Sequence, residues 1–358
     1  MVKRKPEKIR LDCPKHTFII AEAGSNWKCG TFVQDLKRAK ELIRVASEAG
    51  ADAVKFQTYR PETVYVPYAG KSKYLSKHGI NQNIYDVFGH LSMPYKMIPE
   101  LAEYCKKCNI MFMSTPFSVA DAKEVDTYVS IHKVASYEIN HVRLLEFLAR
   151  TKKPIIISTG ASTYKEIDFA VNLVKKNKNY KIALMQCTAK YPAPIESLNL
   201  LTIPEIKSRY GFPVGLSDHS TDPIIGPLVA IGVGATIIEK HFTLDRNLPG
   251  PDHLFALIPS ELKLMVDSIR KAEQARGDGE KQVLKEEKEL RHFATRSLQA
   301  TKDIAKGEKF QEGFNFDVLR PGNQIRGADA KFITKIQGKK SRRNIKAGQG
   351  ILLSDRLD

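Results

Sequence analysis

The sequence predicts an α/β protein, a (β/α)8 (TIM) barrel followed by a small β-rich domain. Eight short apolar runs rich in β-branched residues alternate with amphipathic stretches through the first 276 residues. Polar side chains collect at the carboxyl ends of these runs, which is where barrel enzymes place their active sites. After residue 294 the pattern changes to short β-type runs with frequent glycines. A chain of 358 residues is long enough for both domains.

Each apolar run is typical of a buried strand, and a helix-like segment follows it. The first such segment, 33–50, has apolar residues three and four positions apart and ends in Gly50. An open doubly wound sheet is the alternative, but it would place a glycine-rich phosphate turn after its first strand. The segment there, GSNWKCG (24–30), does not match GxGxxG. The predicted strands are FIIAEAG (18–24), ADAVKFQ (51–57), IMFMSTP (110–116), IHKVAS (131–136), PIIISTG (154–160), KIALMQC (181–187), FPVGLSDH (212–219) and ATIIEKHF (235–242).

The domain boundaries follow from changes in composition. We predict a catalytic barrel over 1–276, a charged linker over 277–293 and a second domain over 294–358. Within the second domain, KDIAKGEKF (302–310) and RNIKAGQGI (343–351) share the pattern basic–x–Ile–x–x–Gly. This repeated pattern indicates duplicated turns in a small β-domain.

Two loops of the predicted barrel are long. Residues 58–93 are rich in Tyr, Gly and Lys, and long rim loops of this kind are usually lids or substrate walls. Residues 243–258 contain Pro249–Gly250–Pro251, which restricts the path of that loop and presents Asp252 and His253.

Composition narrows the class of protein. The net charge is +17 and the pI about 9.5, which favours anionic partners, although the basic residues are spread along the chain as on a solvated surface. Mean hydropathy is −0.31, and no run approaches the roughly 18 apolar residues of a membrane helix. The basic N-terminus has no apolar stretch behind it, so we expect neither a secretory signal nor a membrane protein.

The five cysteines are scattered and odd in number, which indicates reduced thiols and a cytoplasmic location. Cys105 and Cys108 form a CxxC, but no second pair or nearby histidine completes a zinc site. We interpret their spacing as chance.

Two histidines follow neighbouring predicted strands. Strand alternation places His219 on the same face as Ser217, and His241 on the same face as Glu239, so both imidazoles can point inward. Two imidazoles suit Mn²⁺, Fe²⁺ or Zn²⁺ and leave coordination positions open for a substrate oxygen. In the alternative, each histidine only hydrogen-bonds a neighbouring carboxylate, Asp218 or Glu239.

A second group of polar residues predicts an anion site. Ammonium and hydroxyl groups at strand ends, together with the backbone N–H groups at Thr159–Gly160, form a cradle for an anion. Carboxylates nearby supply acid–base groups or bind sugar hydroxyls. Any one of them could instead neutralise a lysine, and Lys133 with Glu138 is the pair most suspected of this. The cradle residues are Lys55, Lys133, Ser158, Thr159 and Ser217, and the carboxylates are Glu22, Glu138 and Asp252.

These segments resemble the sialic acid synthase family, which includes N-acetylneuraminate, legionaminic acid and pseudaminic acid synthases. The resemblance covers nearly the whole chain in order, and GLSDH, EKHFT and PGPD together are highly specific. The matching segments are AEAGSNW (21–27), KFQT (55–58), STPF (114–117), KVASYE (133–138), STGAS (158–162), CTAKYPAP (187–194), GLSDHS (215–220), EKHFT (239–243), PGPDH (249–253), RSLQATKDIAKGE (296–308) and RPGNQI (320–325).

The resemblance implies a barrel followed by an antifreeze-like (SAF) domain, in a domain-swapped homodimer. It implies condensation of phosphoenolpyruvate with an N-acetylated amino sugar of the N-acetylmannosamine type. It also implies a divalent metal, Mn²⁺ first, with Mg²⁺ or Co²⁺ as alternatives. A diacetamido-trideoxyhexose, giving pseudaminic or legionaminic acid, is the alternative sugar.

The resemblance also assigns roles to individual residues. His219 and His241 would hold the metal, and Glu22 would be a candidate acid–base residue beside it. Arg320 would reach from one subunit's small domain into the other's barrel and touch the acyl group. The remaining substrate-binding residues would be Lys55, Gln57, Thr115, Lys133, Ser136, Glu138, Ser158, Tyr191, Ser217 and Asp252.

Two positions depart from the family pattern. Trp27 replaces a histidine in AEIGxNH, and Ala189 stands where an asparagine is frequent in CTNxYP. Other classes stay open as well: a metal-dependent aldolase or hydrolase on the same barrel, and an ice- or carbohydrate-binding protein built around the small domain. Nucleic-acid binding rests on the charge alone, and we expect neither nucleic acid nor membrane as a partner.

Overall fold

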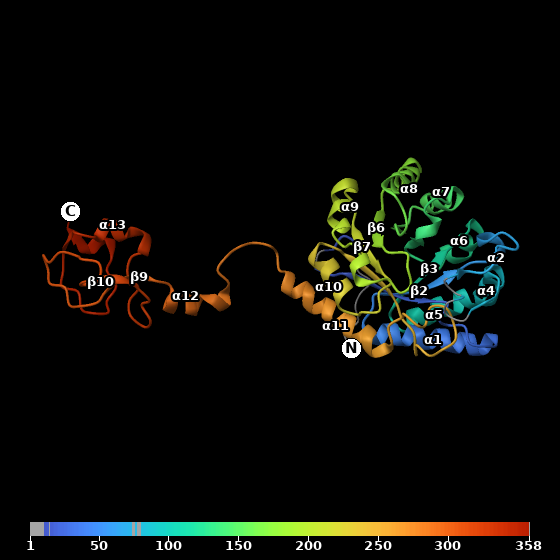
Figure 1. Ribbon diagram of the computed structural model, residues 1–358, viewed down its shortest axis with the longest axis horizontal. Helices are drawn as coiled ribbons and strands as arrows, with labels where there is room; N and C mark the ends of the chain where they lie inside the picture. Colours follow the sequence, from blue (N-terminus) through green and yellow to red (C-terminus); the bar gives the residue numbers. More distant parts are fainter. Residues whose placement is uncertain (1–10, 14, 74–75, 77–79, 358) are drawn as a thin grey trace. The chain divides into compact units, whose positions relative to one another are not determined.

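The computed structural model describes residues 11–13, 15–73, 76 and 80–357, and divides the chain into two compact units, 1–277 and 278–358 (Figure 1). The N-terminal residues 1–10, on which the expected lack of a secretory signal rests, lie outside the described residues. So do five residues of the predicted lid, 74–75 and 77–79.

The first unit contains one eight-stranded parallel sheet with hydrogen-bonded order β3-β2-β1-β8-β7-β6-β5-β4. Its two end strands, β3 and β4, also lie next to each other, so the sheet is nearly closed. Helices surround the strands on the outside (Figure 1). The predicted barrel is therefore confirmed, with all eight predicted runs forming strands. They are β1 (Phe18–Gly24), β2 (Ala53–Thr58), β3 (Met111–Pro116), β4 (His132–Val134), β5 (Ile155–Ser158), β6 (Ile182–Cys187), β7 (Val214–Asp218) and β8 (Ile237–His241).

Helix ends in this unit follow local sequence signals. Thr31 caps α1 (Phe32–Ala49) in a reciprocal box with Gln34, and Gly50 ends it with a φ of 90°. In the described ranges, none of the helices is both long and apolar enough to span a membrane. The other helices are α2 (Pro61–Val64), α4 (Ile84–Leu91), α5 (Met97–Lys107), α6 (Val119–Asp126), α7 (Val142–Arg150), α8 (Tyr164–Lys176), α9 (Thr202–Tyr210), α10 (Ile225–Gly232) and α11 (Pro259–Arg276), with short turns η1 (Ser136–Glu138) and η2 (Ile195–Ser197).

Strand alternation divides the apolar residues into two layers. Residues such as Ile19 and Val54 pack outward against the helices in the main core. Residues such as Ile20 and Ala53 point inward and fill the lower barrel, together with Met113, Ile156, Met185 and Ile237. Because the side-chain period of a strand is two residues, the next inward positions toward the carboxyl ends lie directly above this plug.

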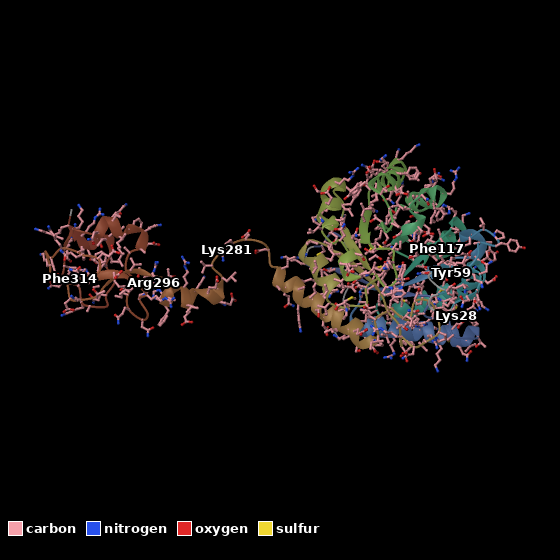
Figure 2. The ribbon with its side chains drawn as sticks, in the orientation of Figure 1. Lys28, Tyr59, Phe117, Lys281, Arg296 and Phe314 are labelled. Carbon is pink, nitrogen blue, oxygen red and sulfur yellow. The ribbon has the colours of Figure 1, made fainter. Side chains whose placement is uncertain are left out.

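The segment predicted as a lid has a small apolar core of its own beside the rim. Tyr59 packs against Phe88, with ring centroids 4.7 Å apart. It also packs against Phe117, with ring centroids 5.3 Å apart, and these two residues are labelled in Figure 2. The Arg60 guanidinium lies 3.7 Å from the centre of the Tyr95 ring and donates to the Met93 carbonyl at 2.9 Å. Arg60 therefore joins the beginning of this segment to its end.

The second unit is small and β-rich, with a core that includes Leu298, Phe310 and Phe316. The echoed segments pair with each other through an antiparallel bridge between Ile304 and Ile345. Residues 277–293, predicted as a linker, are exposed. The elements are η3 (Lys285–Glu287), α12 (Lys288–Ala294), β9 (Ser297–Ala300), β10 (Phe316–Leu319), η4 (Ala330–Phe332), α13 (Ile333–Ile336), β11 (Lys340–Ser341), η5 (Leu353–Asp355) and β12 (Arg356–Leu357).

A substitution at Gly215 can test how tightly the barrel interior is packed. A Cβ on Gly215 of β7 would lie 2.4 Å from the Ile237 carbonyl oxygen of β8. We expect Gly215→Ala to lower the free energy of unfolding by about 2–3 kcal/mol, because neighbouring strands must separate. Urea unfolding measures the change.

The control is Gly232→Ala at the end of α10, where an added Cβ meets nothing within 4 Å. This variant should be neutral or stabilising by up to about 1 kcal/mol, since alanine is the better helix former. Equal stability of the two variants would contradict the close strand contact.

Candidate active site

Inward-pointing polar side chains gather above the apolar plug, at the carboxyl end of the barrel. Each lies two or four positions beyond an inward apolar residue of its own strand, except that Ser217 follows the inward Gly215. His219 comes one residue after β7 ends. The inward polar residues on the strands are Glu22, Lys55, Gln57, Thr115, Lys133, Ser158, Ser217, Glu239 and His241.

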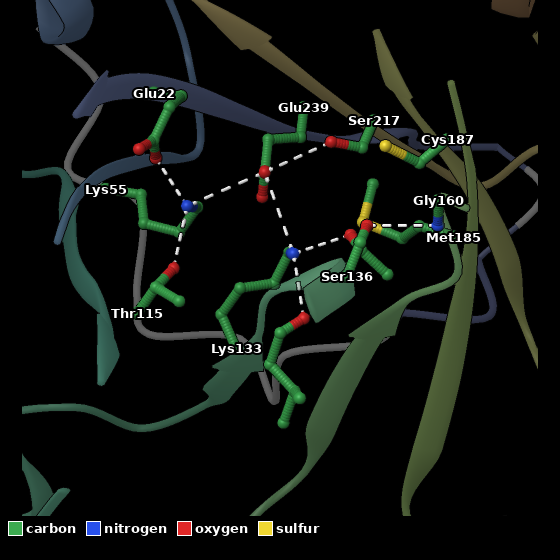
Figure 3. A network of polar contacts seen from close by, with 12 residues as sticks. Glu22, Lys55, Thr115, Lys133, Ser136, Gly160, Met185, Cys187, Ser217 and Glu239 are labelled. Atoms are coloured by element: carbon green, nitrogen blue, oxygen red, sulfur yellow. Dashed lines mark hydrogen bonds and ion pairs between the residues drawn. The ribbon is translucent and has the colours of Figure 1, made fainter. Parts of the chain in front are cut away.

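Two buried lysines converge on one carboxylate (Figure 3). Lys55 Nζ lies 2.5 Å from Glu22 Oε2 and 3.6 Å from Glu239 Oε1, and it donates to Thr115 Oγ1 at 2.9 Å. Lys133 Nζ lies 3.7 Å from the same Glu239 oxygen and donates to Ser158 Oγ at 2.6 Å. All four charged ends, those of Glu22, Lys55, Lys133 and Glu239, are withdrawn from solvent, so each depends on the others for compensation.

The charges in this network shift one another's pKa values. Burial alone would lower the pKa of Lys55, but Glu22 and Glu239 outweigh it and raise that pKa. Burial lowers the pKa of Lys133, with Glu239 acting in the opposite direction. Burial alone would raise the pKa of Glu239, but Lys133 and Lys55 outweigh it and hold that pKa below its ordinary value. Glu239 is therefore the ionised centre of the network.

Glu239 was not among the predicted site residues; sequence reasoning considered it only as a hydrogen-bond partner for a histidine. The sequence did contain the information needed to find it. Glu239 and His241 are two residues apart on β8, so they share a face of the strand and both point inward. The suspected ion pair of Lys133 with Glu138 is wrong. Among the described residues, Lys133 has its ion-pair contact with Glu239 instead.

The expected backbone donors at Thr159 and Gly160 are not free, which corrects the predicted cradle. Thr159 N donates to the Met185 carbonyl at 3.0 Å, because the β5–β6 ladder continues by one residue. Gly160 N donates to Ser136 Oγ at 3.0 Å. A Cβ on Gly160 would lie 2.8 Å from Ser136 Oγ and 2.9 Å from Cys187 Sγ, so the close approach requires glycine.

The two histidines lie together, as predicted. Their ring centroids are 5.5 Å apart, with the planes at 67°. His219 Nδ1 contacts the Thr188 carbonyl at 2.9 Å, so Nδ1 carries the proton and a neutral ring has its lone pair on Nε2. The alternative partner, Asp218, instead receives a bond from the buried Lys240 at 2.6 Å. The carboxylate alternative is therefore wrong for His219.

His241 is suited to act as a neutral ligand. Its Nδ1 is buried and lacks a hydrogen-bond partner within the described ranges. Burial and the positive charges of His219 and the lysines lower the pKa of His241 well below its ordinary value. No cluster of three or more His, Cys, Asp or Glu in the described part of the chain could hold a metal ion. The unpartnered His241 Nδ1 beside the His219 ring is the kind of donor that a divalent metal with water or substrate in its other positions can use.

Aromatic rings enclose the histidine pair. Tyr191 stacks on His219 with centroids 4.0 Å apart, and Phe255 lies 5.0 Å from His241 and 5.1 Å from Tyr191. Cys187 Sγ lies 3.9 Å from His219 Nδ1. Sequence reasoning missed Phe255 and Cys187. The inward phase of β6 could have indicated Cys187, whereas nothing in the pattern of a long loop indicates Phe255.

Three further carboxyl groups at the rim have raised pKa values. Burial raises the pKa of Glu22 to about 7 against the influence of Lys55, and Gln57 Nε2 donates to its Oε1 at 3.1 Å. Burial also raises the pKa of Glu138 to about 7, and its buried Oε2 lacks a hydrogen-bond partner among the described residues. Burial raises the pKa of Asp252, which accepts from Ser25 Oγ at 3.3 Å.

Gly24 makes this arrangement sterically feasible. Its φ is +50°, and a Cβ there would lie 2.7 Å from Asp252 Oδ2 and 3.4 Å from Glu22 Oε1. Glycine at the end of β1 therefore lets two carboxylates from distant segments approach the same point.

The two departures from the family pattern have different surroundings. Trp27 is 1% exposed and belongs to the main apolar core, so it packs rather than faces the site. Ala189 lies beside Gly160, where its Cβ would be 3.1 Å from an added glycine Cβ. Arg320 lies in the second unit, exposed, just after β10.

Fold and site together define a barrel enzyme whose carboxyl-end pocket combines buried lysines, raised-pKa carboxyls and a histidine pair. Comparison with known families gives the particular group. The NeuB family model matches residues 42–281, and the SAF domain model matches residues 295–355. The chain belongs to the sialic acid synthase (NeuB) family, as the motifs predicted.

Known relatives match over most of their length. The spore coat polysaccharide biosynthesis protein SpsE of Bacillus subtilis is 40% identical over 359 residues, which cover 95% of this chain and 93% of that protein. Its crystal structure superimposes with a TM-score of 0.63 at 39% identity, covering 96% of each chain.

Two relatives from Campylobacter jejuni are named as synthases. The N,N'-diacetyllegionaminic acid synthase is 41% identical over 318 residues, 87% of this chain and 92% of that protein. The pseudaminic acid synthase is 36% identical over 344 residues, 95% of this chain and 97% of that protein.

Glu239→Gln tests the charge network without an activity assay. The change removes the charge that lies 3.6 and 3.7 Å from two buried ammonium groups. We expect the free energy of unfolding to fall by about 3 kcal/mol, since two buried cations lose their shared partner. Inorganic phosphate should restore more stability to this variant than to the wild type, because it can replace the missing anion. Urea unfolding with and without phosphate measures both effects.

The matched control is Glu41→Gln, which removes an exposed carboxylate 2.5 Å from Arg44. Exposed ion pairs contribute little, so its effect should stay within about 0.5 kcal/mol. A Glu239→Gln protein as stable as this control would argue against a shared buried counter-ion.

The raised pKa of Glu138 predicts that the stability of the protein depends on pH. Burial raises the pKa of this carboxyl from its ordinary value of 4.5 to about 7 in the folded protein. Between these values the folded state binds a proton that the unfolded state has lost, so stability decreases as pH rises. We compare the free energy of unfolding of the wild type with that of Glu138→Gln. The wild-type value minus the variant value should fall as the pH rises from 4.5 to about 7, and it should level off above pH 7. Unfolding curves measured at several pH values test this; a difference that is flat or rises would contradict it.

Proposed function

We propose that this NeuB-family enzyme condenses phosphoenolpyruvate with an N-acetylated amino sugar, giving a nonulosonic acid and inorganic phosphate. The single observation that carries the proposal is the convergence of Lys55 and Lys133 on one Glu239 oxygen, in the same interior as the His219–His241 pair. A cationic pocket beside two imidazoles suits an anionic substrate that reacts with a polarised carbonyl.

The phosphoenolpyruvate half of the site is assigned to the lysine network. Lys133 and Lys55 would turn from Glu239 toward the phosphate and carboxylate, which carry more charge than the glutamate. The hydroxyls of Thr115 and Ser158 already contact the two ammonium groups, and Ser217 contacts Glu239. Ser136 belongs to this half through its contact with Gly160.

The sugar half is assigned to the side of the pocket that contains Glu138 and Asp252. Glu138 Oε2 is a buried acceptor without a hydrogen-bond partner in the described part of the chain. Sugar hydroxyl and amide N–H groups are donors that would satisfy it and Asp252. Gln57 and Tyr191 complete the proposed sugar contacts.

His219 and His241 would hold the divalent metal, for which we propose Mn²⁺ first, with Mg²⁺ or Co²⁺ as alternatives. When bound, such an ion supplies Lewis-acid polarisation of the sugar carbonyl. Thr188 orients His219 by accepting from Nδ1, and the rings of Tyr191 and Phe255 restrict water around the pair.

In the proposed chemistry, C3 of phosphoenolpyruvate bonds to the aldehyde carbon of the open-chain sugar, using the electrons of its C2=C3 double bond, and the aldehyde oxygen becomes a hydroxyl. A water oxygen bonds to C2 and becomes the keto oxygen of the product as the C2–O bond to phosphate breaks. Of the two water protons, one ends on the former aldehyde oxygen and one leaves with the phosphate. Lys133 and Lys55 hold the departing phosphate, and one well-placed donor of this kind contributes about 3–4 kcal/mol. Glu22, with its pKa raised to about 7, holds a proton close to the pH at which it must be exchanged.

A diacetamido-trideoxyhexose is the second candidate sugar. The observation that favours it is the name of two relatives, which are legionaminic and pseudaminic acid synthases at 41% and 36% identity. We therefore propose an N-acetylated amino sugar as the substrate class. The assay below distinguishes a sugar of the N-acetylmannosamine type from a diacetamido-trideoxyhexose.

The remaining predictions concern assembly. In the proposed domain-swapped homodimer, Arg320 of one subunit would contact the acyl group in the other subunit's barrel. Dimerisation, the role of Arg320, the cytoplasmic location and the expectation of neither nucleic acid nor membrane as a partner all stay predictions.

The proposal is tested by product mass. The purified chain with Mn²⁺ and phosphoenolpyruvate is given N-acetylmannosamine, its 6-phosphate, or each of two diacetamido-trideoxyhexoses. We expect release of one phosphate per nonulosonic acid with at least one sugar, and loss of that activity on chelation of the metal. No phosphate release with any of these sugars would count against the proposal.

Lys133→Ala separates this proposal from a metal-dependent aldolase or hydrolase. A synthase should lose about 100-fold or more in kcat/KM for phosphoenolpyruvate, because a pre-organised donor is removed. An aldolase has no use for the phosphate and would keep its activity. Lys107→Ala, on the exposed surface of α5, is the control and should leave kinetics unchanged.

A further inference from the structure

The end of the rim loop 243–258 is hydrogen-bonded to the end of β8 and to the start of the loop. Thr243 N donates to the Leu257 carbonyl and Leu257 N donates to the His241 carbonyl, each at 2.9 Å. Farther out, Arg246 Nε donates to the Ala256 carbonyl at 2.9 Å. These bonds hold the two ends of the loop together, but they do not involve its tip, residues 249–253.

A buried hydrogen bond from His253 ties the tip to the base of the loop. Thr243 Oγ1 and His253 Nδ1 are 2.6 Å apart, and the two residues are 0% and 1% exposed. Thr243 Oγ1 also donates to the Asp245 carbonyl at 3.1 Å. His253 thus reaches back through the loop to the residue that follows the strand.

The tip is packed directly on this imidazole. Gly250 has a φ of +148°, and a Cβ there would lie 2.9 Å from His253 Cδ2. Only glycine accommodates both the backbone angle and the contact. The turn Pro249–Gly250–Pro251 therefore rests on the His253 ring.

Two residues near His253, Asp252 and Phe255, lie at the site. Asp252 accepts from Ser25 Oγ at 3.3 Å, beside Gly24. Phe255 lies 5.0 Å from His241 and 5.1 Å from Tyr191. We assign both to the sugar side of the pocket, whereas the two lysines of the charge network come from β2 and β4.

We propose that the buried Thr243–His253 hydrogen bond is a positioning element for the sugar half of the site, because it fixes the loop tip that presents Asp252 and Phe255. The inference rests on the proposed function for its kinetic readout. Neither residue touches substrate: each acts through the loop.

Thr243→Val removes the hydroxyl at nearly constant volume. We expect KM for the amino sugar to rise about tenfold, because the buried bond to His253 is lost together with the contacts of the hydroxyl to Asp245, with KM for phosphoenolpyruvate within about twofold of wild type. Thr243→Ser keeps the hydroxyl and should restore the sugar KM. Thr243→Ala removes the same hydroxyl and replaces the valine variant if that protein fails to fold.

The matched control is Thr236→Val, just before the opposite end of β8. Thr236 is also buried, and its hydroxyl donates to the Leu11 carbonyl at 2.6 Å. This variant loses a comparable bond away from the rim, so both KM values should stay at wild type. Equal effects of Thr243→Val and Thr236→Val, or a parallel rise of both KM values, would overturn the inference.

Trp27 gives a readout that does not need activity. It is the single tryptophan, it is 1% exposed, and its neighbour Asn26 donates to the Phe242 carbonyl at 2.8 Å. If the wild type turns over none of the sugars, the proposed function fails and acrylamide quenching of Trp27 decides the positioning role. Increased quenching in Thr243→Val but not in Thr236→Val supports the inference, and unchanged quenching in both overturns it.

Discussion

Everything at the carboxyl end of this barrel depends on the placement of one carboxylate between two buried ammonium groups. Glu239 Oε1 lies 3.6 Å from Lys55 Nζ and 3.7 Å from Lys133 Nζ. Without it Lys133 would lose its ion-pair contact and Lys55 would keep only Glu22, and a folded protein tolerates such a loss of charge compensation poorly.

The same two-residue period that fills the barrel also builds the site. On β2, Ala53 contributes to the apolar plug, and Lys55 and Gln57 follow it on the same face. On β8, Ile237 is followed by Glu239 and His241. The apolar plug closes the lower barrel and lowers the local polarity. Because water has limited access, the interactions between the charged groups above the plug are stronger. Packing and catalysis therefore share one constraint, which is the inward register of the strands.

Sequence reasoning predicted the strands, the histidine pair and most inward polar residues, because each follows from local alternation. It failed where a partner had to be chosen. Lys133 was paired with Glu138, five residues away, yet its counter-ion Glu239 is more than a hundred residues distant. The Gly160 amide was counted as a free donor, but Ser136 accepts from it. Phe255 was missed because a long loop has no period that indicates which way its residues point.

The sequence by itself determined which residues face the barrel interior, since strand alternation is a local property, and its motifs determined the family. The tertiary structure alone decided which of those inward groups touch. Closing the sheet brings β2, β4 and β8 around one small interior, where distances of a few ångströms select among several chemically equivalent carboxylates. Electrostatic pairing depends on those distances and on burial, and neither is encoded in the spacing of residues along the chain.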